Sequence, residues 1–337
     1  MLYFRNDYGA GAHPKVLEAL SRTNMDLTPG YGTDHYCQEA AETIRTLCKA
    51  PHAAVHFLPG GTQVNKTAIG AFLRPYEAAV AAASGHICVH EAGAIQQDGH
   101  AIIQLLSPDG KLTPEMLRAV ADGPVNEHTV VPRLVYISNT TELGTVYTAP
   151  ELRALRGACD EYGFYLYCDG ARLGSAMEAG GTAFADYAET CDAFTIGGTK
   201  NGLLFGEALV IVNPALQPNF RSCMKQQGAM LAKGRLLGVQ FQAVLEDGLY
   251  GRLAAHANAL ARRLAEGLAE RGIPLLVPAG SNQVFPVLPD DAVEFLREKV
   301  EFEVERKMEE GHTCIRFVTA WHTSEEDVDS LLELFKE

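Results

Sequence analysis

The sequence lacks an excess of basic residues. Among its 337 residues, 28 are Lys or Arg and 42 are Asp or Glu, which gives a formal net charge of −14 at pH 7. The lysines and arginines form no block along the chain. Binding to the phosphates of nucleic acids, or to an anionic membrane surface, depends on such clusters of positive charge. The composition therefore argues against nucleic acid and membrane partners.

Long apolar runs are also absent, although 47% of the residues are hydrophobic. No uninterrupted apolar stretch is long enough to span a bilayer. The N-terminus, MLYFRNDYGAG, carries charges where a secretory signal would be apolar. We find no internal repeat and no low-complexity segment. The sequence predicts a soluble globular protein of the cytoplasm with a large core.

Closely spaced cysteine pairs are missing as well. The eight cysteines are scattered, and several lie in apolar runs such as YLYCDG. Without a CxxC pair, neither a disulfide framework nor a zinc site is indicated. The pairs His52/His56 and His86/His90 have the spacing of metal ligands, but no third ligand is evident. We expect buried, reduced thiols and no bound metal.

Strand-like and helix-like stretches alternate over the first two thirds of the chain. The strand-like runs are AAVHFL, HICV, RLVYIS, FYLYCD, AFTIGG and EALVIV. Helices are expected at Tyr36–Lys49, entered through Asp34, and at Pro150–Glu161, entered through Thr148. This alternation predicts an α/β fold, in which a mostly parallel sheet is covered by helices on both faces. From about residue 215 the pattern changes to long helical stretches (225–250 and 253–272), then short strands and a terminal helix.

Polar residues stand next to these apolar runs, where ligands bind in a parallel sheet. Gly60, Gly61 and Thr62 follow HFLP, Asp169 follows YLYC, and Lys200 follows FTIGGT. His86 precedes ICV, and NTTELG follows VYIS. We expect these positions to converge on one cleft.

Four features of this set together suit pyridoxal 5′-phosphate (PLP). Backbone N–H groups of the GGT segment, at a predicted helix N-terminus, would favour a phosphate. Asp169 would meet a ring nitrogen, His86 would stack on a ring, and Lys200 would react with an aldehyde. Taken singly, each feature has an ordinary explanation: a glycine turn, a structural Asp169–Arg172 pair or a solvated lysine. The combination predicts a PLP site.

The same segments resemble the threonine aldolase family, which belongs to the PLP-dependent enzymes of fold type I (aspartate aminotransferase-like), in the group that includes the β-eliminating lyases. The resemblance covers essentially the whole chain, in the expected order. The motifs that carry it are FRNDYGAGAHP, GYGTDHYC, GGTQVN, GHICVHEAGAI, DGARLGSA, GGTKNG, KQQGAMLAKG and CIRFVTAWHT. It implies an N-terminal arm (1–12), a large PLP-binding domain (13–245) and a small C-terminal α/β domain (246–337).

Roles at the cofactor follow from the resemblance. Lys200 would be the lysine that binds PLP covalently, Asp169 would contact the pyridine nitrogen, and His86 would lie against the ring. The phosphate would be held by the turn Gly60, Gly61 and Thr62, with Arg172 and Lys225 also near the cofactor.

The resemblance also implies how the substrate is held. Arg172 and Arg316 would meet the carboxylate of an amino acid, assisted by Asn6 in place of the usual serine. Tyr31 and Lys225 would reach into the site of a neighbouring subunit, which implies a homodimer or a homotetramer.

One position departs from the family pattern. A histidine near the substrate β-hydroxyl is replaced by Thr141, followed by Glu142, in SNTTELG. The candidates for the proton acceptor are then His86, a water that it holds, His35 from the mobile loop, and Glu91.

The predicted function is a PLP-dependent aldehyde-lyase. It would cleave a β-hydroxy-α-amino acid such as L-threonine or L-allo-threonine to glycine and an aldehyde. Two alternatives stay open: a PLP-dependent β-eliminating lyase or aminotransferase acting on another amino acid, and a non-catalytic PLP-binding homologue.

Overall fold

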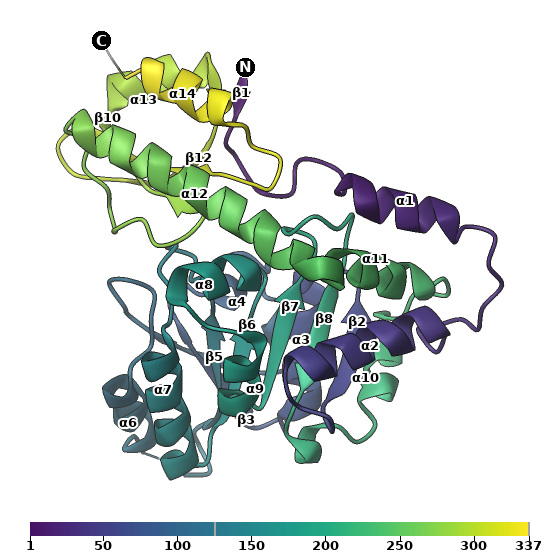
Figure 1. Cartoon of the computed structure of the whole chain (residues 1–337). Coiled ribbons are helices and arrows are strands. Elements are labelled where there is room, and N and C mark those ends of the chain that lie inside the picture. The colour runs from purple at the N-terminus through teal and green to yellow at the C-terminus, as the bar shows by residue number, and fades with distance from the viewer. Residues whose placement is uncertain (125, 336–337) are drawn as a thin grey trace.

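The computed structural model describes residues 1–124 and 126–335, and its centre is a seven-stranded sheet (Figure 1). The strand order is β2-β8-β7-β6-β5-β3-β4. Strands β3 to β7 pair in parallel, whereas β8 is antiparallel to β2 and to β7. The mostly parallel α/β sheet is therefore confirmed. The strands are β2 (Ala54–Leu58), β3 (Glu77–Ala82), β4 (Ile102–Leu105), β5 (Val131–Ser138), β6 (Tyr165–Asp169), β7 (Ala193–Gly197) and β8 (Glu207–Ile211).

Helices cover both faces of this sheet. Alternate strand residues enter two separate hydrophobic clusters: Ile137 belongs to one, packed by α2 and α7, and Tyr136 belongs to the other, packed by α3. The helices are α1 (Pro14–Arg22), α2 (His35–Leu47), α3 (Gly61–Phe72), α4 (His86–Val89), α5 (Ala94–Gln97), α6 (Pro114–Ala121), α7 (Ala149–Tyr162), α8 (Leu173–Gly180), α9 (Phe184–Thr190), α10 (Phe220–Gln226) and α11 (Arg235–Leu245).

The two helices expected near the N-terminus and mid-chain are confirmed, with their caps. Asp34 caps α2 by accepting a hydrogen bond from the backbone N–H of Cys37 at 2.9 Å. Thr148 and Glu151 form a capping box at the start of α7. These side chains satisfy N–H groups that have no partner within the helix.

The expected strand HICV is wrong, because His86–Val89 forms the short helix α4. The strand in this part of the chain is β3, whose sequence EAAVAA has a single β-branched residue. It is paired on both sides and almost fully buried, so small side chains suit the close packing of helices above and below it. Because β-branched residues are the main local signal for a strand, an alanine-rich run such as this one is not recognised from its sequence. His86 nevertheless lies just after β3, at the carboxyl edge of the sheet.

The expected long helix 225–250 is only partly helical. Helix α10 ends at Gln226 and α11 begins at Arg235. Gly228 between them has a φ of +67°, a left-handed conformation that ends a helix and that glycine adopts without strain.

A second core packs against the C-terminal half of the long helix α12 (Leu249–Glu270), away from the large sheet. Figure 1 shows both chain termini in this part of the molecule. This core joins Leu264 of α12, Phe317 and Leu331 to Phe4 of the N-terminal arm. The division near residue 245 stays a prediction. The remaining elements are β1 (Leu2–Tyr3), β9 (Gln283–Val284), β10 (Val287–Pro289), α13 (Asp290–Arg297), β11 (Val300–Glu301), β12 (Glu303–Lys307), β13 (His312–Val318) and α14 (Glu325–Glu333).

All eight cysteines are free thiols. Six of them are buried as expected, whereas Cys88 and Cys223 are only partly buried. In the described part of the chain, no helix combines the length and the apolar character needed to cross a bilayer.

Candidate active site

A cavity of about 430 Å³ lies where the carboxyl edge of the large sheet meets the small sheet of β10, β12 and β13. It is lined by His86, Glu142, Arg172 and Lys200 from the large sheet and by Arg316 from β13. Four of these five residues are predicted site residues. Of the strand-end positions expected to converge, His86, Lys200 and Glu142 of NTTELG line this cavity, whereas Asp169 and the turn Gly60–Thr62 are not part of its lining. The small sheet closes the cavity on its other side.

Lys200 lies in the turn after β7, half-buried, with no described hydrogen bond to its amine. Burial, the largest cause, and the positive charge of Arg172 lower the pKa of Lys200 below its usual value of 10.5, against the opposing charges of Asp7 and Glu142. A lowered pKa increases the neutral fraction, which is the nucleophilic form of the amine.

The turn that carries Lys200 is fixed from beneath by Glu207 at the start of β8. Its carboxylate accepts hydrogen bonds from the backbone N–H of Gly198 at 3.1 Å and from the hydroxyl of Thr199 at 2.8 Å. A Cβ on Gly198 would lie 2.6 Å from the carbonyl oxygen of Gly206. Only glycine allows the backbone at position 198 to lie this close to Gly206. The glycine before Lys200 is therefore required by the packing of the turn itself.

We expect the buried carboxyl of Glu207 to make stability depend on pH. Burial raises its pKa from 4.5 to about 7. Between these values the folded protein holds a proton that the unfolded chain has lost, so stability falls as pH rises from about 4.5 through 7, by roughly 3 kcal/mol. Chemical unfolding should show the parent losing stability relative to Glu207→Gln as pH rises over this range, because the amide of the variant does not titrate. A difference that is constant with pH would contradict the raised pKa.

Asp169 is buried at the end of β6, and both of its carboxylate oxygens accept hydrogen bonds. Its Oδ2 accepts from Asn65 Nδ2 at 2.8 Å and from the Tyr136 hydroxyl at 2.7 Å, and its Oδ1 accepts from the Ala171 N–H at 3.0 Å. Burial, followed by the charge of Asp169, raises the pKa of Tyr136 far above 10, so Tyr136 remains a donor. Three donors therefore hold the Asp169 side chain in place.

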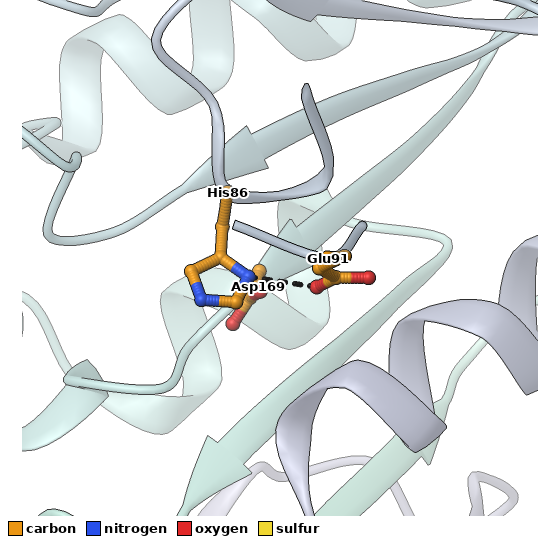
Figure 2. Close-up of side chains that lie close together, drawn as sticks. All are labelled: His86, Glu91 and Asp169. Atoms are coloured by element: carbon orange, nitrogen blue, oxygen red, sulfur yellow. Dashed lines mark hydrogen bonds and ion pairs between the residues drawn. The ribbon is translucent and has the colours of Figure 1, made fainter. Parts of the chain in front are cut away.

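His86 lies over this network, as Figure 2 shows, and is held by a second buried acid. Its Nδ1 lies 2.7 Å from Glu91 Oε1, which also accepts from Asn65 Nδ2 at 2.8 Å. Burial lowers the pKa of His86, but the hydrogen bond to Glu91 and the charges of Glu142 and Asp169 outweigh it, so the net pKa is raised.

Ligand atoms of His86, Glu91 and Asp169 lie within 4.8 Å of one another. Hydrogen bonds already engage both oxygens of Asp169 and one oxygen of Glu91. We therefore interpret the three residues as a hydrogen-bonded network that orients His86.

The glycine turn Gly60–Gly61 opens the twelve-residue helix α3, where no side chain caps the N-terminus. A Cβ added at either glycine would meet no atom within 4 Å, so the turn faces open space. Free backbone N–H groups at the start of a helix, including that of Thr62, form an anion site.

The two arginines have different surroundings. Arg172 is buried, and its Nε and one terminal nitrogen donate to Asp7 at 2.6 and 3.1 Å. Burial would raise the pKa of Asp7, but the charges of Arg172 and Lys200 lower it below its usual value. Arg316 lies in the same cavity, and its buried Nε has no hydrogen-bond partner among the described residues. An unpaired buried donor in a cavity points to an anionic ligand.

Thr141 is buried and its hydroxyl is engaged within its own turn. It contacts Thr145 Oγ1 at 2.7 Å and accepts from the Thr145 N–H at 3.2 Å, while Thr145 Oγ1 donates to the Asp109 carbonyl at 2.7 Å. The next residue, Glu142, lines the cavity.

Four further predicted residues lie outside the lining of this cavity. Asn6 donates to the Tyr3 hydroxyl at 2.9 Å and accepts from the Tyr8 N–H at 3.1 Å. The Lys225 ammonium lies 4.5 Å from the ring centroid of the exposed Tyr31. His35 is exposed and its ring centroid lies 4.0 Å from that of Tyr36.

Sequence reasoning missed the structural partners Asp7, Asn65 and Glu207. Asp7 and Asn65 lie within quoted motifs, but they meet their partners from more than 100 residues away, and Glu207 reaches the lysine turn from the next strand. The sequence analysis named Glu142 as the residue after Thr141, where the chain differs from the family pattern. It did not predict the turn that places Glu142 in the cavity lining.

The chain is similar to known proteins over most of its length. Residues 4–291 match the family model described as Beta-eliminating lyase. A low specificity L-threonine aldolase of Pseudomonas aeruginosa is 33% identical over 99% of this chain and 96% of its own. The chain belongs to the β-eliminating lyase family.

Solved structures agree with this family assignment. A Leishmania major threonine aldolase is 43% identical, with a TM-score of 0.98 over 100% of this chain and 99% of its own. A Sphingomonas wittichii serine palmitoyltransferase shares the fold alone, with 17% identity and a TM-score of 0.76 over 99% of this chain and 86% of its own. The predicted PLP-dependent fold type I is confirmed.

The residues of this β-eliminating lyase family member fit PLP. Lys200 has an amine without a partner, Asp169 presents a stabilised carboxylate, and the α3 turn faces open space at Gly60 and Gly61. The lysine amine can react with the aldehyde of PLP, the carboxylate can contact its ring nitrogen, and the helix N-terminus can bind its phosphate.

Proposed function

We propose that this chain is a PLP-dependent aldehyde-lyase that cleaves β-hydroxy-α-amino acids, of which threonine and allo-threonine are the simplest, to glycine and an aldehyde. The observation that carries the proposal is that Lys200 and Arg316 line the same cavity and that neither side chain has a described hydrogen-bond partner. The names of the full-length relatives support the substrate class.

In this proposal, PLP supplies an electron sink for the bond cleaved at the substrate Cα. Lys200 would bind the aldehyde group of PLP, Asp169 would keep a proton on its ring nitrogen, and His86 would contact the ring. The N–H groups of Gly61 and Thr62 bind the phosphate.

Arg316 binds the substrate carboxylate, because its guanidinium is free. Arg172 contributes only the part of its guanidinium that Asp7 leaves open, so its main effect is to fix the arm beside the cavity. Asn6 supports the same arm through Tyr8, which also lines the cavity. The carboxylate and the amine together fix the orientation of the bond to be cleaved.

We propose further that the protein works as a homodimer or homotetramer. The exposed ring of Tyr31, with Lys225 beside it, lies apart from the cavity of its own chain and suits a contribution to the site of a second copy. His35, also exposed, would act from the same segment. The free thiols suit the reducing cytoplasm.

A product assay tests the function. Purified, PLP-loaded protein is incubated with a panel of β-hydroxy-α-amino acids, and glycine, aldehyde, ammonia and keto acids are measured. We expect glycine and aldehyde in equal amounts. The family description favours β-elimination as the second candidate, and ammonia with a keto acid would establish it. A keto acid without ammonia would indicate transamination, and no product would indicate a non-catalytic protein.

A further inference from the structure

Glu142 stands apart from Asp7, Asp169 and Glu91 because no described residue holds its carboxylate; Glu305 shares this feature at the same cavity, but it is exposed. Glu142 is half-buried, lines the cavity together with Lys200 and Arg316, and has no hydrogen bond or ion pair to any residue within 1–124 and 126–335. By contrast, Asp7, Asp169 and Glu91 are each bonded to at least two groups.

A rigid turn presents Glu142 to the cavity. The Thr141 N–H donates to the Thr145 carbonyl at 2.9 Å, and the Gly144 N–H donates to the Thr141 carbonyl at 3.0 Å. Gly144 has a φ of +75°, which permits the tight return of the chain. Thr145 is anchored in turn to the carbonyl of Asp109. The backbone of Glu142 is therefore fixed while its side chain remains free.

Other groups are less suited to take a proton from a substrate hydroxyl. Glu91 is buried with its side chain 0% exposed, beneath His86. The hydroxyl of Thr141 is used within its turn, and His35 lies outside the cavity lining. His86 has its Nδ1 engaged by Glu91, and its raised pKa increases the fraction of the ring that already carries a proton.

We propose that Glu142 is the catalytic residue that accepts the β-hydroxyl proton of the substrate. This inference rests on the proposed function. The hydroxyl proton moves to a Glu142 oxygen, the O–H electron pair forms the C=O bond of the aldehyde, and the Cα–Cβ bond breaks. The electron pair of that bond is left at Cα, and PLP, when bound, would supply the electron sink for it. One proton then returns to Cα to give glycine, so no further reactant is needed.

Glu142→Gln tests this role because the amide keeps the size of the side chain but cannot accept a proton near neutral pH. We expect kcat/KM for threonine and allo-threonine cleavage to fall about 10²–10⁴-fold. Exchange of the glycine Cα proton in D₂O, followed by NMR, involves no hydroxyl and should stay within about threefold of the parent. Glu142→Asp, which retains a carboxylate, should recover part of the cleavage activity.

A matched control is Glu305→Gln, which removes one negative charge from an exposed position at the same cavity. It should lower cleavage far less than Glu142→Gln. The proposal is overturned if Glu142→Gln cleaves like the parent, if cleavage and glycine exchange fall equally, or if Glu305→Gln gives the same loss. A parent that exchanges glycine but cleaves no member of the panel would instead refute the proposed function.

Discussion

Replacing Lys200 by Ala should abolish covalent attachment of PLP and lower turnover by about 10⁴-fold or more, because the chain loses both its nucleophile and a proton carrier at Cα. The folded structure should persist, since the Lys200 amine makes no described hydrogen bond that the fold would lose. The visible absorbance of lysine-bound PLP should disappear, while circular dichroism should match the parent.

Peptide mapping identifies the attachment site directly. After borohydride reduction of the parent protein, the pyridoxyl group should be found on Lys200. Lys225 is an informative internal control, because it lies by Tyr31 and outside the cavity lining. Label on Lys66, Lys225 or Lys233, or a Lys200→Ala protein that retains the lysine-bound absorbance, would show that the site is elsewhere.

Replacing Asp169 by Asn should lower turnover on the order of 10³-fold, equivalent to about 4 kcal/mol in the activation barrier. An amide cannot stabilise a protonated pyridine nitrogen as a carboxylate does. Its NH₂ group would also face a donor, whichever way it is oriented, because Asn65, Tyr136 and the Ala171 N–H all donate to Asp169. Bound PLP should remain measurable by absorbance, because Lys200 and the α3 turn are unchanged.

Tyr136→Phe is the matched control for this prediction. It removes one hydrogen bond to the Asp169 carboxylate but leaves the charge in place, so turnover should fall much less than in Asp169→Asn. Its expected cost in stability is about 1 kcal/mol. Near-parental activity of Asp169→Asn, or equal losses in the two variants, would show that the charge of Asp169 has no special role.

Much of the fold followed from local chemistry. Apolar runs with branched and aromatic residues became β5, β6, β7 and β8, and the capped helices α2 and α7 formed where their caps predicted. The two misread segments failed for identifiable reasons. Alanine-rich β3 is stabilised by its neighbours on both sides, and the turn at Gly228 divides an otherwise helical composition.

The sequence by itself determined which residue types stand at the strand ends, and hence the prediction that Lys200, Asp169, His86 and the Gly60–Gly61 turn belong to one site. This was possible because parallel strands carry the residues that follow them to the same edge of a sheet.

Only the tertiary structure decided how these groups are held and which remain free. Asp7 binds Arg172 from 165 residues away, whereas Glu91 binds His86 and Glu207 binds the lysine turn from nearby positions that the fold turns toward them. Among the described residues, none forms a side-chain hydrogen bond or ion pair with Arg316 or Glu142, which lie in the same cavity. Such pairing depends on where turns and neighbouring elements place each side chain in space, which residue types and spacing do not specify.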